Sequence, residues 1–309
     1  MLRLLALHIA AAFSLFSLNN AFAVEQITPL ANPDTMVVRY SEPGNSDVAR
    51  FGYQYALMHL ILEETREEFG GYTIETYRGP ELSIQRYAVL LNEGVTVNVG
   101  WGPPGSLISK SDSTPINIDI FHNLLGYRIC LTNKNGAADL ASIKSLAEFR
   151  RVKVGQGVNW ADIPIYAHNE VTTVAAPTFE SLFQMLTLNR FDCLALGANE
   201  VQNLYREKKD IYPALRVDEH LLLYYSFPIY FYVSNKTPKL IARIKSGLNK
   251  IQKNGEHDRL FIRHHGNDLE SLNLKNRNII CLKSPYLPTV GQCSKPIILP
   301  EMSNKYSNQ

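Results

Sequence analysis

The chain has 309 residues, of which 45% are hydrophobic, and its 31 basic and 29 acidic side chains give a formal net charge of +2. Such a balanced charge predicts no polyanionic partner and excludes a nucleic-acid-binding protein of the basic type. The length suits one or two domains.

The first residues have the pattern of a secretory signal. Arg3 is the only charge before Glu25, residues 4–18 are mostly apolar, and residues 21–23 (Ala-Phe-Ala) have small side chains at the two positions that signal peptidase requires. The apolar run is too short and too serine-rich for a membrane span. We therefore expect residues 1–23 to be a signal peptide cleaved after Ala23, and the mature protein to be periplasmic.

The next hundred residues alternate between strand and helix patterns with short connections. This alternation predicts an α/β fold with parallel strands covered by helices. The expected strands are residues 36–40, 72–77 and 95–99, and the expected helices are residues 53–68 and 83–91. Ser83 can cap the second of these helices.

Two loops follow strands of this first region and should face the same ligand site, because ligands of such sheets bind beyond the carboxyl ends of the strands. Glu42 and Asn45 lie in the first loop, and Trp101 and Gly102 lie in the second. An indole on a Gly/Pro loop offers a stacking face and one N–H donor, so Trp101 is a candidate ligand contact. The alternative is that Trp101 plugs the edge of the core.

A third candidate loop follows the apolar strand at residues 152–154. The sequence Gly155-Gln156-Gly157 allows a tight turn with exposed N–H groups, and a helix starting near Asn159 would add partial positive charge. This pattern can hold a carboxylate, a phosphate or a neutral polar group, although many α/β loops with this pattern bind nothing. The candidate ligand contacts here are Gln156, Gly157, Asn159 and Trp160.

A fourth candidate loop, at residues 197–200, ends the strand that begins near Asp192. It carries Asn199 and Glu200. Glu200 can meet a cationic ligand, but an acid that starts a helix is the commoner role.

The order of motifs from residue 145 onward resembles a known family. A short amphipathic element at residues 145–150, the strand with Gly-Gln-Gly, and Asn189-Arg190-Phe191-Asp192 before the next strand are similar to the second lobe of the periplasmic solute-binding proteins of the amino-acid-binding type. The later block of strand, Lys, Pro, helix, Asn-Gly and helix resembles the return to the first lobe. Asn189 departs from the family, which usually has Gly there.

The resemblance implies a two-lobed type II periplasmic-binding fold, with two parallel-type sheets joined by two hinge strands. It implies a monomer that closes on a small polar solute and delivers it to a membrane transporter or sensor, without a cofactor, a metal ion or catalytic residues. The implied parts are residues 24–126 (first part of lobe 1), 127–223 (lobe 2), 224–266 (return to lobe 1) and 267–309 (a C-terminal extension outside the resemblance).

One departure puts an ordinary amino-acid ligand in doubt. Members of the family carry an arginine after the third strand that grips the ligand carboxylate. Here residues 102–110 contain none, and the next arginine is Arg128. Lys110 or Arg39 would have to substitute.

The four cysteines fit an exported protein and match no zinc-binding spacing. We expect Cys281 and Cys293 to form a disulfide within the C-terminal tail. Cys130 and Cys193 lie in strand-like runs, and the sequence leaves open whether they pair or remain buried thiols.

The sequence also bears on two other functions. An enzyme is disfavoured because no Gly-x-Ser-x-Gly, His-Glu-x-x-His or P-loop motif is present, and His122, His168, His220 and His257 are isolated in sequence. His264 and His265 are adjacent and would point apart on a helix, which disfavours a shared metal. The alternative to transport is a sensor or assembly module that kept the fold and lost the ligand, with the tail docking a partner or strapping the lobes.

Overall fold

The computed structural model describes residues 35–41, 48–77, 79, 82–134 and 140–287, without the side chains of residues 48–51. The expected signal peptide, Glu42, Asn45 and Cys293 lie outside the described residues. Residues 34–309 form one compact unit, and it is described here.

The first group of strands, called lobe 1, contains β1 to β4 and β11. β1 and β2 are parallel, whereas β11 lies antiparallel between β3 and β4. Side-chain bonds from Asn98 to the backbone of Val37 and Arg39 join these two sheets. The strands are β1 (Met36–Ser41), β2 (Tyr72–Tyr77), β3 (Val99–Gly102), β4 (Ser113–Ile116) and β11 (Tyr230–Ser234).

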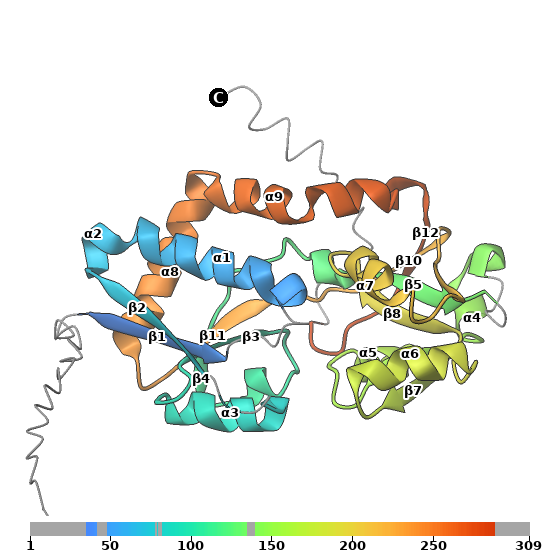
Figure 1. Ribbon diagram of the computed structural model, residues 1–309, viewed down its shortest axis with the longest axis horizontal. Coiled ribbons are helices and arrows are strands. Elements are labelled where there is room, and N and C mark those ends of the chain that lie inside the picture. The colour runs from blue at the N-terminus through green and yellow to red at the C-terminus, as the bar shows by residue number, and fades with distance from the viewer. Residues whose placement is uncertain (1–34, 42–47, 78, 80–81, 135–139, 288–309) are drawn as a thin grey trace, which may run out of the picture. The chain divides into compact units, whose positions relative to one another are not determined.

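Five helices belong to lobe 1, and Figure 1 shows the three longest, α1, α8 and α9, side by side. The expected cap at Ser83 is present, because its Oγ accepts a hydrogen bond from the N–H of Arg86. The helices are α1 (Val48–Glu64), α2 (Arg66–Phe69), α3 (Ile84–Glu93), α8 (Pro238–Lys253) and α9 (Glu256–Ser271).

The second group, called lobe 2, is a seven-stranded mixed sheet. β6 is parallel to β7 and β8, and β10 is parallel to β12, but β5 runs antiparallel to β8, β9 and β10. The sheet is therefore less purely parallel than the sequence predicts. In order, the strands are β12 (Asn278–Cys281), β10 (Leu221–Tyr224), β5 (Tyr127–Asn133), β8 (Cys193–Gly197), β6 (Val154–Gly157) and β7 (Thr173–Ala176), and β9 (Leu215–Val217) also pairs with β5.

Four short helices accompany this sheet. α6 begins at a capping box in which Thr178 and Ser181 bond each other's backbone N–H groups. Its inward face, Leu182, Phe183 and Leu186, is fully buried. The helices are α4 (Leu146–Phe149), α5 (Ile163–His168), α6 (Phe179–Thr187) and α7 (Val201–Lys208).

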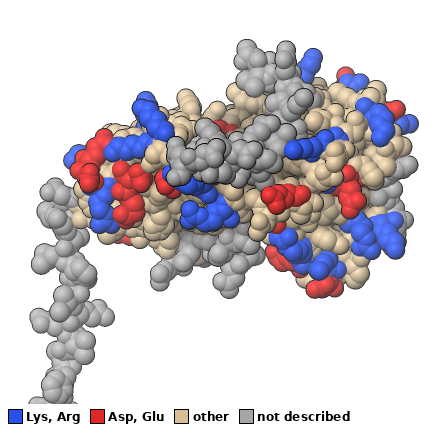
Figure 2. All heavy atoms as spheres, turned by 90° about the horizontal axis from the view of Figure 1, so that it is seen from above, with Lys and Arg blue, Asp and Glu red and all other residues tan. Residues whose placement is uncertain are grey.

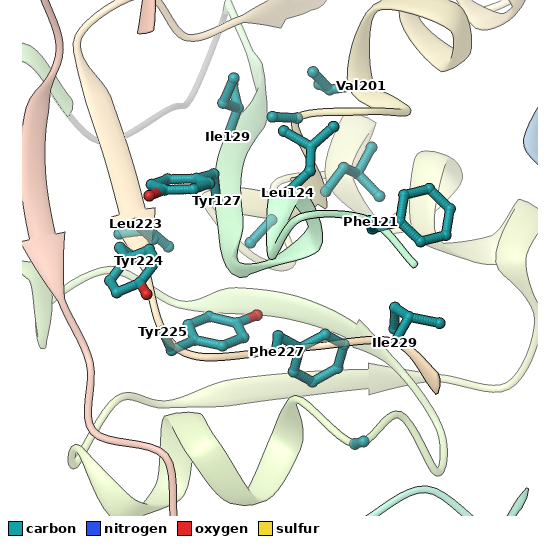
Figure 3. Close-up of a cluster of buried hydrophobic side chains, with 14 of the residues drawn as sticks. Phe121, Leu124, Tyr127, Ile129, Val201, Leu223, Tyr224, Tyr225, Phe227 and Ile229 are labelled. Atoms are coloured by element: carbon teal, nitrogen blue, oxygen red, sulfur yellow. The ribbon is translucent and has the colours of Figure 1, made fainter. Parts of the chain in front are cut away.

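The chain passes between the lobes after β4 and again after β10. Two side chains pin these crossings together: Asp119 accepts the N–H of Ile229, and Asn123 accepts the N–H of Phe227. Figure 3 shows the apolar side chains that fill the space around both segments, including Phe121 from the first. The crossings are therefore held by buried polar contacts as well as by apolar packing.

A third passage, which the sequence did not predict, follows α9. The tail enters lobe 2 as β12, next to β10. Arg277 secures it by donating hydrogen bonds to the carbonyl groups of Asp218, Leu221 and Leu272. Part of the predicted extension is thus built into the lobe 2 sheet.

The question left open for Cys130 and Cys193 is answered, because they form a disulfide with Cα atoms 5.0 Å apart. They lie on neighbouring strands β5 and β8, where Cys130 faces Ala195. Cys281 is not a free thiol, but its expected partner Cys293 is outside the described residues, so that pairing stays a prediction. No described helix has the length and apolar composition of a membrane span.

Candidate functional site

The candidate site begins on one face of the lobe 2 sheet. Arg128 lies opposite Gly197, and Cys130 lies opposite Ala195, across β5 and β8. The register of β6 with β8 places Gln156 on the same face, because side chains alternate along a strand. That face therefore presents a guanidinium and an amide near the carboxyl ends of β6 and β8.

Arg128 is buried and is the centre of a polar network. Its Nη2 lies 2.8 Å from Oδ1 of Asp162, and its Nε donates to the Tyr225 hydroxyl at 2.9 Å. Its Nη1 lies 4.0 Å from Oε1 of Glu200. The Tyr225 hydroxyl donates in turn to Asp162. The three partners, Asp162, Glu200 and Tyr225, thus come from three separate segments of the chain.

Aromatic rings enclose this network. The guanidinium carbon of Arg128 lies 4.8 Å from the ring centre of Phe227 and 5.5 Å from that of Tyr225, and Figure 3 shows these two rings next to one another. Tyr166 completes the enclosure, with its ring 5.9 Å from that of Tyr225. The rings exclude water, so the charges act in a medium of low dielectric constant.

The electrostatics keep Arg128 charged. Burial lowers the pKa of Arg128, but electrostatic interactions, first with Asp162 and then with Tyr225, Tyr166 and Glu200, outweigh burial and raise it overall. Burial also raises the pKa of Tyr166 and Tyr225, so both phenols keep their protons. Formally the network holds one cation and two carboxylates, which leaves one negative charge.

Two amide side chains on the same face as this network have unused hydrogen-bonding atoms. Gln156 is 0% exposed, and neither its Oε1 nor its Nε2 has a hydrogen-bond partner among the described residues. Oδ1 of Asn199, which is 9% exposed, has none either. Buried polar groups are normally paired, and an unpaired one costs about 1–3 kcal/mol. A ligand that bonds these amides would recover that free energy.

The glycine of β8 is required by the site's geometry. A Cβ atom at Gly197 would lie 2.4 Å from Oδ1 of Asn199 and 3.5 Å from both Nη1 of Arg128 and Oε1 of Glu200. The N–H of Gly197 donates to Glu200 at 3.2 Å. A side chain at this position would displace the Asn199 amide, whereas Arg128 and Glu200 lie at ordinary contact distance.

The structure differs from the expected turn at residues 155–157, because these residues are β6 itself. Gly155 is needed inside the strand, since a Cβ atom there would lie 2.3 Å from the ring of Phe191. The helix begins at Ile163 rather than near Asn159, which is exposed and has a φ of 68°. Gln156 is therefore a buried strand residue and not a residue of an open loop.

Trp160 lies on the opposite side of β6 from Gln156. A Cβ atom at Gly157 would lie 2.3 Å from Nε1 of Trp160, and Gly157 alternates with Gln156 along the strand. The indole packs near Phe179, with ring centres 6.2 Å apart. The structure thus brings Gln156, Asn199 and Glu200 to the Arg128 face but does not bring Trp160 there.

In lobe 1, Trp101 is half-buried on β3. Its ring meets those of Tyr55 and Phe231 edge-on, at 5.4 Å and 6.4 Å. This packing fits the alternative in which Trp101 plugs the edge of the core. A Cβ at Gly102 would lie 3.0 Å from Oγ of Ser106, which shows how tightly this loop folds.

The tail lies against the Gly/Pro loop of lobe 1. A Cβ at Gly105 would lie 2.3 Å from the ring of Tyr286, and the charge of Asp162 in lobe 2, after burial, helps to raise the pKa of Tyr286. Asn169 next to α5 holds the same segment, by bonds to the backbone N–H and carbonyl of Lys283. Tyr286 therefore lies close to residues of both lobes at the candidate site.

Neither substitute for the family's missing arginine belongs to this network. Arg39 pairs with Glu75 at 2.7 Å, and Lys110 is exposed. Arg128, Asp162 and Tyr225 were not predicted as site residues. The signal that could have identified Arg128 is an arginine within a strand that is buried throughout, residues 127–133.

Charges of both signs lie on the described surface that Figure 2 presents. Figure 2 shows basic and acidic side chains interspersed on the face that it presents. This mixture agrees with the near-balanced composition.

Comparison with known proteins gives the fold. No family model and no curated protein matches the sequence. Among solved structures, the BvgS VFT2 domain of Bordetella pertussis is 15% identical, with 76% of this chain and 94% of that one aligned and a TM-score of 0.53. An ancestral arginine-binding protein bound to glutamine is 16% identical, over 75% and 98%, with a TM-score of 0.51.

A histidine kinase sensor domain with similarity to periplasmic binding proteins is 17% identical, over 75% of this chain and 96% of that one, with a TM-score of 0.51. At such identities the likeness establishes the fold alone. The chain has the two-lobed fold of the type II periplasmic binding proteins, as its motif order predicts.

Proposed function

We propose that this protein is exported to the periplasm and closes its two lobes on a small polar solute, which it delivers to a membrane transporter or sensor. Two lobes joined by crossing segments can hinge, and a ligand that contacts both lobes stabilises the closed form through its higher affinity for it. The observation that supports the proposal most is Gln156, whose buried amide has two unused hydrogen-bonding atoms.

The chemistry of the network indicates what the solute presents. Nη2 and Nε of Arg128 are already engaged by Asp162 and Tyr225, so a ligand carboxylate would have to compete for Arg128. The excess negative charge instead favours a cationic or neutral group with hydrogen-bond donors, placed near Glu200. The amides of Gln156 and Asn199 would fix its orientation. Trp101 and Gly102 would contribute from lobe 1.

We also propose that the protein is not an enzyme. Arg128, Asp162 and Tyr225 are bonded to one another, and this arrangement favours holding a solute over transferring a proton. Incubating the bound solute with the protein and following it by mass spectrometry tests this statement. Conversion of the solute at a rate that depends on protein concentration would overturn it.

The experiment that tests the binding proposal is mass spectrometry of the small molecules released from the purified protein, followed by calorimetry with the molecule found. Gln156→Met should weaken binding at least tenfold, and His59→Asn, on exposed α1 surface, should leave it unchanged. Trp101→Ala separates the two readings of Trp101, because unchanged affinity would assign it to the core alone.

A sensor or assembly module that lost its ligand is the second candidate, and the contact of Tyr286 with the Gly105 loop favours it. In that case the tail takes the place of a solute. Tyr286→Ala should then leave the protein unable to bind any member of a metabolite panel. Under the transport proposal the same variant binds the cognate solute as well as, or better than, the parent protein.

A further inference from the structure

The fold brings together three metal-binding side chains that are far apart in the sequence. His122 lies in the first crossing between the lobes, and His257 and Asp258 lie in the first turn of α9. One donor atom from each lies within 4.8 Å of the other two. This cluster uses neither His264 nor His265, the adjacent pair that the sequence disfavours as metal ligands.

The distance between two of the donors already suits a small metal ion. Nε2 of His122 lies 3.4 Å from Oδ1 of Asp258. Metal–nitrogen and metal–oxygen bonds of about 2.0–2.1 Å in tetrahedral geometry place neighbouring donors roughly 3.4 Å apart. The side chains of His122 and Asp258 are 21% and 17% exposed, so an ion can enter from solvent and keep a water ligand.

His257 supplies a donor that is already oriented. It is 0% exposed, and its Nε2 lies 3.1 Å from the carbonyl oxygen of Ile120. A carbonyl can only accept, so Nε2 carries the proton and Nδ1 presents its lone pair. Nδ1 has no hydrogen-bond partner within the described part of the chain. A metal-ligating histidine is typically held in this way, with its other ring N–H donated to a backbone carbonyl.

We propose that His122, His257 and Asp258 form a binding site for a divalent transition-metal ion such as Zn²⁺, with a water molecule as the fourth ligand. Two imidazoles and one carboxylate are a donor set that zinc takes in proteins. The ring centres of His122 and His257 lie 4.5 Å apart, so the two imidazoles are already next to one another.

The ion would join two segments that matter for lobe motion. Ile120 and His122 belong to the first crossing, and α9 leads to the third. The Tyr53 hydroxyl, from α1, also donates to the carbonyl of Ile120. A bound ion would therefore restrict movement of the first crossing relative to α9.

The test is titration of the metal-free full-length protein with Zn²⁺ by calorimetry, and with Co²⁺ by visible absorption. One equivalent of each should bind, and Co²⁺ should give the intense bands of a tetrahedral site. At 100 times the dissociation constant, Zn²⁺ should raise the melting temperature by about 5 °C.

Two variants identify the ligands. His122→Asn keeps a residue that tolerates the positive φ of 50° at this position, and Asp258→Asn keeps the shape of the side chain. Each should lower Zn²⁺ affinity at least tenfold and abolish the Co²⁺ bands. His59→Asn, which changes an exposed histidine on α1, is the matched control and should bind like the parent.

Three results would overturn the proposal: no binding of either ion, the same affinity in both ligand variants, or equal loss of affinity in His59→Asn. Circular dichroism of each variant shows that it is folded before titration.

Discussion

Arg243 in lobe 1 and Arg128 in lobe 2 are both buried, and their hydrogen bonds are satisfied in different ways. In lobe 1, Arg243 is 0% exposed and donates to the hydroxyl of Thr65 and to the carbonyl groups of Leu62, Gly70 and Gly71. In lobe 2, Arg128 is held by carboxylates and a phenol. Burial lowers the pKa of Arg243, whereas the pKa of Arg128 is raised.

The difference separates a structural arginine from one at a site. The partners of Arg243 are mainly carbonyl groups where α1 and α2 end. The guanidinium therefore donates hydrogen bonds that these carbonyl groups do not receive within their own helices. Arg128 instead has neighbours with hydrogen-bonding atoms left over, Gln156 and Asn199. A buried charge alone is therefore a poor marker of function, and unused polar capacity beside it is a better one.

The largest predicted effect is at Arg128. Arg128→Met leaves Asp162 as a buried carboxylate without its cationic partner. The variant should therefore lower the free energy of unfolding by about 4 kcal/mol. Urea denaturation measures it. The double variant Arg128→Met/Asp162→Asn should recover at least half of the loss, and no recovery would mean that packing, not charge, holds Arg128 in place.

The next largest effect on stability comes from the buried imidazole of His265. Burial, followed by the nearby His264, lowers the pKa of His265 to about 4, so the folded state resists a proton that the unfolded chain accepts near its ordinary pKa of about 6.5. Stability is therefore complete above about pH 6.5 and falls as the pH drops towards 4, by roughly 3 kcal/mol.

Unfolding of the parent and of His265→Phe, measured from pH 7 to pH 4, checks this dependence. The phenylalanine fits a position surrounded by Tyr53, Phe121 and Phe261 and cannot titrate, so its curve should fall less steeply. Parallel curves would show that other groups cause the acid sensitivity.

Arg243→Met should cost about 2 kcal/mol, because the freed carbonyl groups of Gly70 and Gly71 lie at exposed residues where water can replace part of the lost bonding. Ligand affinity should not change, in contrast to any variant of the Arg128 network. A loss of affinity in this variant would remove the proposed distinction between the two arginines.

The sequence predicted the elements better than it predicted the site. The fold, the cap at Ser83 and the helix opening at Pro238 follow from local patterns, because capping, periodicity and turn residues act over a few positions. The motif order predicted the fold of lobe 2 but misplaced residues 155–157, which form a strand because they pair with β7 and, at Gly155, with β8.

The site depends on contacts between residues far apart in the chain, which local patterns do not encode. Arg128 meets Tyr225 across 97 positions and Asp162 across 34, and His122 meets His257 across 135. The tail strand β12 was missed for the same reason, since its partner β10 lies more than 50 residues upstream. Gln156, Asn199 and Glu200 were predicted as candidates because each lies at or just after the end of a strand, where ligands of α/β folds bind, and their role in binding stays a prediction.

The smallest predicted change in stability is at Gln156, the residue on which the proposed binding site depends most. Gln156→Met replaces an unpaired buried amide by an apolar side chain of similar length, so the ligand-free protein should become more stable by about 1 kcal/mol. Its affinity for the copurified solute should fall at least tenfold. Gln156→Glu, which adds a charge at the same place, is the matched variant and should be less stable than the parent.

The most direct measurement is therefore the melting temperature of Gln156→Met with and without that solute. The account predicts a higher melting temperature than the parent without solute and a smaller rise than the parent shows when the same concentration of solute is added. A lower melting temperature with an undiminished response to solute would contradict it.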